Sequence, residues 1–119
     1  MNTHPPLPQW RLHLDDMIDL CTQVLATTKG LSQAQLLADA ARLETTVHTI
    51  ELISAAASHI PEYIRAASPT IHWRMLIATC KQLKHGEQGV DTELLWNIVD
   101  TDIPTLLISL KALKATLAP

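Results

Sequence analysis

Apolar residues recur along this chain at intervals of three and four positions, which is the period of a helix with one apolar face. The first such run is predicted to be a helix from about Gln9 to Thr28, because prolines precede it and Lys29-Gly30 supplies a stop signal. Its apolar stripe consists of Leu14, Met17, Ile18, Cys21 and Leu25.

A second helical stretch is predicted to follow Ser32, a residue suited to an N-cap, and to extend to about Ile60 with a break near Asp39. Apolar or small residues alternate four and three positions apart along it, namely Leu36, Ala40, Leu43, Val47, Ile50, Ser54 and Ala57. This spacing is typical of an antiparallel helix pair. The partner helix is either a neighbour in the same chain or a second copy of the chain.

The second half of the chain continues the pattern. Pro61 and Pro69 bracket a linker, and the next helix is expected to start near Thr70 or Ile71. Its stripe consists of Trp73, Leu76, Ile77, Cys80 and Leu83, and Gly86 and Gly89 are expected to end it. Asp91 is a suitable N-cap for the last helical segment, in which Asp102 and Pro104 predict a kink or a restart. One face of that segment carries Leu106, Leu110, Leu113 and Leu117.

These segments predict an all-α fold, an antiparallel up-and-down bundle of four to six helices with short connections. A length of 119 residues suits one domain. We therefore expect residues 1–8 to be a flexible N-terminal arm and residues 9–119 to form a single helical domain. The sequence has no alternating β pattern with tight-turn signals and no glycine-rich phosphate loop.

Composition narrows the functional classes. Hydrophobic residues make up 47% of the chain, yet no run approaches the roughly eighteen apolar residues that cross a bilayer. With no secretion signal at the start, we expect a cytoplasmic protein with no membrane partner.

Cys21 and Cys80 lie far apart on apolar stripes, which favours buried thiols over a disulfide. No zinc spacing occurs, and we expect no metal and no cofactor.

The most informative chemistry lies near the expected helix end at His85. A histidine that titrates near neutrality, beside a lysine such as Lys81 one turn earlier, is the minimum equipment for metal-independent RNA cleavage. Both residue types are also common in the last turn of a helix because they complement its dipole. Since the net charge is −3, RNA contacts would have to come from a local cluster, for which Arg74, Lys81 and Lys84 are the candidates.

This region resembles the HepT-like branch of the HEPN superfamily, whose pattern is Trp-Arg, then Arg-Asn-x-x-x-His-x-Tyr, then Gly-Val-Asp and a Trp. Trp73-Arg74, His85, Gly89-Val90-Asp91 and Trp96 match it in order and spacing. The similarity extends from about Leu12 to about Leu113. It implies the HEPN helical arrangement, a homodimer with a cleft built from both chains, action on RNA, and pairing with an MNT-type nucleotidyltransferase in a toxin–antitoxin module.

The chain departs from the catalytic part of that pattern. The family's arginine falls on Cys80, its asparagine on Lys81 and its tyrosine on Glu87, so only His85 remains. A further acidic position of the family falls within Ser54-Ala55-Ala56. In relatives whose tyrosine accepts nucleotidyl groups, a glutamate cannot be the same acceptor. Our hypothesis is that Glu87 imitates a permanently modified, anionic state.

The preferred interpretation is a HepT-like component of a prokaryotic toxin–antitoxin module that binds a cognate nucleotidyltransferase, with weak or lost ribonuclease activity. Within the family, the alternative is an active metal-independent RNA endonuclease that uses His85 with Lys81 or Lys84 in place of the arginine. From another class, the alternative is a helical protein-interaction adaptor.

Overall fold

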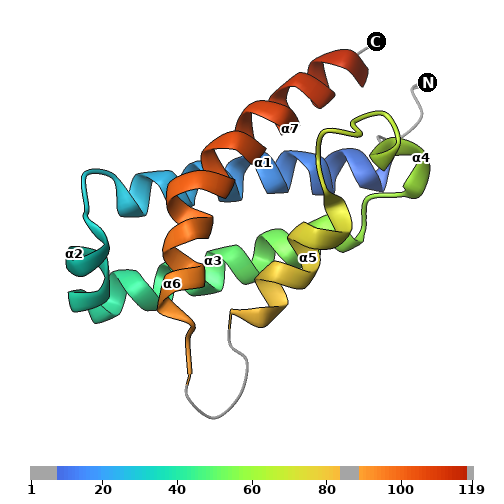
Figure 1. Ribbon diagram of the computed structural model, residues 1–119. Coiled ribbons are helices and arrows are strands. Elements are labelled where there is room, and N and C mark those ends of the chain that lie inside the picture. Colours follow the sequence, from blue (N-terminus) through green and yellow to red (C-terminus); the bar gives the residue numbers. More distant parts are fainter. Residues whose placement is uncertain (1–7, 84–88, 118–119) are drawn as a thin grey trace, which may run out of the picture.

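The computed structural model describes residues 8–83 and 89–117, and these ranges contain helices and no strand (Figure 1). The all-α fold is therefore confirmed. The α-helical segments are α1 (Gln9–Thr28), α2 (Gln33–Ala38), α3 (Ala40–Ser58), α4 (Glu62–Arg65), α5 (Trp73–Gln82), α6 (Thr92–Asn97) and α7 (Ile103–Leu117), and a π-helical turn, η1 (Ile98–Asp102), joins α6 to α7.

The long helices form an antiparallel bundle. Figure 1 shows α1 and α3 running in opposite directions side by side, with α2 at the turn between them. In the continuous run α6–η1–α7, η1 and α7 pack on α1, and α5 packs on α3. Predicted stripes supply the core on both sides: Leu14, Met17 and Cys21 of α1 are buried, as are Leu106, Leu110 and Leu113 of α7.

The alternating stripe of the second stretch belongs mainly to this intrachain core. Val47, Ile50, Ser54 and Ala57 are all buried within the single chain. Of the two alternatives for the partner helix, the neighbour in the same chain is therefore the one observed for these positions. Helix α3 buries an unusually wide face, which also includes Thr46, Thr49, Ile53 and Ala56, because α1 and α5 pack on different sides of it.

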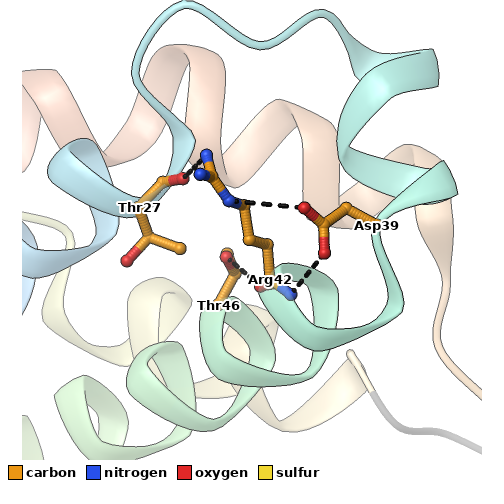
Figure 2. Close-up of polar contacts among 4 residues, drawn as sticks. All are labelled: Thr27, Asp39, Arg42 and Thr46. Atoms are coloured by element: carbon orange, nitrogen blue, oxygen red, sulfur yellow. Dashed lines mark hydrogen bonds and ion pairs between the residues drawn. The ribbon is translucent and has the colours of Figure 1, made fainter.

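Caps define the corner between α2 and α3. The Ser32 hydroxyl accepts a hydrogen bond from the Gln35 backbone N–H, and the Gln35 side chain accepts one from the Ser32 N–H, a capping box at the start of α2. Asp39 interrupts the helix, as predicted, and its carboxylate accepts the Arg42 N–H at 3.1 Å to cap α3 (Figure 2).

The Arg42 side chain extends this corner to α1. Its Nε lies 3.3 Å from the other Asp39 carboxylate oxygen, and its Nη1 donates to the Thr27 carbonyl at 3.4 Å (Figure 2). The last turn of α1 and the first turn of α3 are thereby joined through two residues.

Replacing Asp39 with alanine should lower the free energy of unfolding by about 1 kcal/mol, because the cap of α3 is lost and the exposed ion pair adds little. Urea denaturation followed by circular dichroism measures the change. Asp16→Ala is the matched control, since it removes one exposed carboxylate of α1 that is not a cap. Equal losses in both variants would show that net charge, and not the cap, is responsible.

Two helix boundaries correct or refine the sequence analysis. Helix α5 begins at Trp73 and not at Thr70 or Ile71, because the Ile71 N–H donates to the Ser68 carbonyl in a turn that precedes the helix. The kink or restart predicted at Asp102 and Pro104 corresponds to the end of η1, after which the α-helical segment α7 begins at Ile103. Proline has no N–H to continue the α-helical ladder, and the Ile103 N–H donates to the Ile98 carbonyl five residues back, which makes the turn π-helical.

The start of the domain is only partly described. Residues 1–7 lie outside the described ranges, so the flexible arm and the boundary at residue 9 stay predictions. Pro8 precedes the first residue of α1, as the proline pattern suggested. Within the described residues, no helix combines the length and apolarity that a membrane crossing requires.

Candidate functional site

Helix α5 presents two cations on one exposed face. Arg74 and Lys81 are both exposed and are seven residues apart, which is two helical turns and about 10 Å along the axis. The next phosphate-binding candidate, Lys84, lies outside the described residues. Lys81 also stands in the last turn of the helix, where a positive charge is favoured by the dipole. The described part of the predicted RNA-contact cluster is thus accessible to solvent.

Cys80, in contrast, points into the bundle and is 3% exposed. Burial raises its pKa to about 11, and the nearby Asp102 carboxylate adds to the rise. Burial likewise raises the pKa of Cys21 to about 12, with a smaller contribution from Cys80. Both thiols are free and buried, as the stripes predicted. At neutral pH Cys80 is therefore a neutral group, neither a cation nor an activated nucleophile.

A hollow separates α3 from the end of α5. It has a volume of about 360 Å³ and is lined by Glu51, Ser54, Ala55, Ser58, Cys80 and Lys81. Lys81 supplies an ammonium group and Glu51 a carboxylate, while the Ser58 hydroxyl already donates to the Ala55 carbonyl at 2.6 Å. Glu51 was not among the site residues predicted from the sequence. Its position one helical turn before Ala55 was the available signal, because residues four apart share a helix face.

Arg65 fixes the other end of α5. Its Nε donates to the Ile60 carbonyl at 2.9 Å and its Nη2 to the Ala57 carbonyl at 3.1 Å. The guanidinium carbon also lies 5.9 Å from the ring centre of Trp73, within the range of a cation–π contact. One side chain therefore caps the C-terminal end of α3 and holds the first residue of α5. Because its donors are used in this way, Arg65 is a structural residue and a poor candidate for binding phosphate.

The remaining predicted catalytic residue, His85, lies outside the described ranges together with Lys84 and Glu87, so their roles stay predictions. Contacts of Leu83 and Asp91 join the chain on the two sides of this segment. The Asp91 N–H donates to the Leu83 carbonyl at 2.9 Å, and the Asp91 carboxylate accepts the Leu94 N–H to cap α6, as expected. Gly89 has φ of +82°, a conformation that favours glycine.

Histidine and acidic residues elsewhere do not gather into a metal site. Within the described residues, no group of three or more His, Cys, Asp or Glu side chains could hold an ion. On α1, the His13 ring stacks on His59 with centres 4.5 Å apart, and Asp15 lies 2.7 Å from the Lys114 ammonium of α7. These contacts join α1 to the end of α3 and to α7.

The fold and the site together define a helical bundle in which one helix carries exposed cations beside a hollow with a carboxylate. A family model described as "Ribonuclease HepT-like" matches residues 17–113, well over half of the chain. The chain belongs to this HepT-like ribonuclease family. Membership agrees with the resemblance carried by Trp73-Arg74, His85, Gly89-Val90-Asp91 and Trp96. It does not support the alternative that the chain is an adaptor unrelated to this family.

Curated relatives agree with the family. A protein named "Probable ribonuclease HepT" from Thermococcus cleftensis is 28% identical over 94 residues, which cover 79% of this chain and 86% of the relative. A protein of Methanocaldococcus jannaschii whose name describes an RNase is 25% identical over 93 residues, 78% of this chain and 85% of its own length. A third, from Caldanaerobacter subterraneus subsp. tengcongensis, also named as an RNase, is 23% identical over 96 residues, with coverages of 81% and 86%. No solved structure matches the chain.

Proposed function

We propose that this protein is a HepT-like subunit of a prokaryotic toxin–antitoxin module that binds an MNT-type nucleotidyltransferase and cleaves RNA weakly or not at all. The observation that carries the proposal is Cys80. It stands where the family resemblance places the catalytic arginine, and its buried side chain has a pKa of about 11. It therefore contributes no positive charge at neutral pH.

The missing charge matters because a guanidinium holds a phosphate through its positive charge and two fixed hydrogen bonds. A neutral thiol supplies neither the charge nor the pair of hydrogen bonds. Removal of one such transition-state contact typically lowers a rate roughly 10²- to 10³-fold. Lys81 follows Cys80 directly but leaves the helix on the exposed side. Its flexible ammonium supplies a point charge without the geometry of the arginine fork.

The proposal includes a homodimer, for which the exposed side of α3 is the favoured surface. Leu52 is 42% exposed there although it is apolar, and Ala55 is an exposed small residue on the rim of the hollow that also contains Lys81. A second copy on this surface would enclose the hollow between two chains. A specific interface should bury more than about 1,000 Å² in total.

A second candidate function is an active, metal-independent RNA endonuclease that uses His85 with Lys81 or Lys84. The observation in its favour is that Lys81 and Arg74 are both accessible on one face of α5. In this version Lys81 would take over part of the work of the absent arginine.

Co-purification and cleavage assays distinguish the two functions. The tagged chain is co-expressed with the product of any adjacent nucleotidyltransferase reading frame. The molar mass of the purified complex is then measured by light scattering. RNA cleavage by the chain alone is then measured in EDTA, with His85→Ala as the matched control. We expect a stoichiometric complex, a dimeric mass for the chain alone, and cleavage close to that of His85→Ala.

Rapid cleavage that depends on His85 would favour the endonuclease over the binding subunit. A nucleotidyltransferase that elutes apart from the chain would contradict the partner, and a monomeric mass at micromolar concentration would contradict the dimer.

A further inference from the structure

A second hollow, on the other flank of α5, lies between that helix and the η1–α7 run. We call it the α5–α7 groove; its volume is about 270 Å³, and its apolar lining includes Ile71, Leu76, Cys80, Ile98 and Leu106. Typical pockets for drug-sized molecules have about 300–1,000 Å³. The groove is therefore suited to a ligand about the size of a single long side chain.

The π-helical turn supplies the polar part of this groove. Because the Ile103 N–H bonds to the Ile98 carbonyl, η1 is wider than an α-helical turn, and its last residues Thr101 and Asp102 line the groove. Thr79, Thr105 and Ser109 also line the groove, and the Thr105 hydroxyl donates to the Thr101 carbonyl at 3.0 Å. Single π-helical turns inside α-helices are frequent at functional sites.

Charge in the groove is unbalanced. Among the described residues that line it, Asp102 is the only carboxylate, none is a lysine or arginine, and His72 is the only basic side chain. Across residues 8–83 and 89–117, the Asp102 side chain makes no hydrogen bond or ion pair. Partial burial raises the pKa of Asp102, as expected for a carboxylate that has lost water without gaining a cation.

We propose that the α5–α7 groove binds a small organic cation with an apolar stem, a primary amine or a guanidine, whose head pairs with Asp102 and whose stem lies on the apolar lining. An anion would meet the Asp102 charge, and a neutral apolar molecule would desolvate that carboxylate further without compensation. The surrounding hydroxyl oxygens can accept the remaining N–H donors of such a head group. This site is distinct from the exposed Arg74–Lys81 face, and it does not depend on the proposed function.

A pair of isosteric probes tests the site. The isotope-labelled full-length protein is titrated with n-butylguanidinium and, separately, with neutral N-butylurea, and methyl signals are followed by NMR. We expect n-butylguanidinium to shift the signals of Leu76, Ile98 and Leu106 while those of Leu14 on α1 stay in place. Butylurea should bind at least about tenfold more weakly, because a charge-assisted hydrogen bond is replaced by a neutral one.

Two matched variants locate the charge. Asp102→Asn should weaken n-butylguanidinium binding at least about tenfold. Asp100→Asn removes the same charge two residues away, at a side chain outside the groove lining, and should leave binding unchanged. Circular dichroism checks the folding of both, and the comparison of the two probes on the unmodified protein stands without them.

Equal binding of the two probes, unchanged binding to Asp102→Asn, or equal weakening by Asp100→Asn would each overturn the proposal. So would groove signals that respond to protein concentration and not to the probe, since the occupant would then be a side chain of a second copy.

Discussion

Cys80→Arg is expected to raise the rate of metal-independent RNA cleavage roughly 10²- to 10³-fold over the unmodified protein, because it restores a transition-state charge at the family position. The structure provides space for the change. Cys80 borders the hollow of about 360 Å³ beside α3, where the Glu51 carboxylate and the exposed Lys81 also lie. A longer side chain can enter that hollow, and its stem can remain against apolar neighbours. Cleavage of a labelled RNA in EDTA measures the gain.

Cys80→Met is the control, because it lengthens the side chain without adding charge. It should fold and leave the rate unchanged, and His85→Ala in the Cys80→Arg background should abolish the gain. A folded, dimeric Cys80→Arg variant that cleaves nothing would mean that Glu87 or the missing acidic position at Ala55 also blocks activity. The double variant with Glu87→Tyr would then be the next test. Cleavage by the unmodified protein that is already as fast as that of an active Cys80→Arg variant would refute our preference for a binding role.

Alkaline pH is expected to destabilise the fold strongly through its two buried thiols. Burial raises the pKa values from 9.0 to about 11 for Cys80 and about 12 for Cys21, so the folded state holds these protons more tightly than the unfolded state. The stabilisation is complete below pH 9 and is lost as pH rises toward the folded values. Each thiol contributes a loss of about 1.4 kcal/mol per pH unit, or about 5 kcal/mol for both by pH 11.

Urea denaturation midpoints between pH 8 and 11 measure this loss, which is large against a typical total stability of about 5–15 kcal/mol. The control is the double variant Cys21→Ala/Cys80→Ala, which removes both thiols and keeps every other ionisable group. It should be less stable at pH 8 because it leaves small cavities, yet its stability should fall much less between pH 9 and 11. An equally steep fall in the double variant would assign the alkaline transition to other groups.

Helix ends with a local chemical cause could be predicted from the sequence. Ser32, Asp39 and Asp91 each cap a helix through their own side chains, and the stop after Thr28 coincides with Gly30, which has φ of +76°. Such contacts involve only a few consecutive residues. The start of α5 was predicted too early because the turn from Ser68 to Ile71 uses a backbone hydrogen bond that leaves no distinctive pattern in the sequence.

Features that depend on how the helices pack could not be predicted from the sequence. Since α3 buries a wide face, its periodicity does not tell which residues meet α1 and which border α5, and Glu51 was therefore missed. Asp102 was read only as part of a helix boundary, because its place opposite α5 follows from the π-helical turn and from the path of the chain through residues far apart in sequence. The burial of Cys80 could be predicted in advance, since three- and four-residue spacing places it on the apolar stripe of α5 with Trp73 and Leu76.

The position of α5 has a mechanical consequence. Arg65 contacts the ring of Trp73, the first residue of α5. A backbone hydrogen bond from Asp91 to Leu83 holds the chain just beyond the last residue of the helix. Between these two contacts, Cys80 borders a hollow on each flank of the helix. The helix is thus held in place at both ends, with a hollow on either side of its middle part. Any displacement toward α7 narrows the α5–α7 groove and widens the hollow beside α3, so the volumes of the two are inversely related.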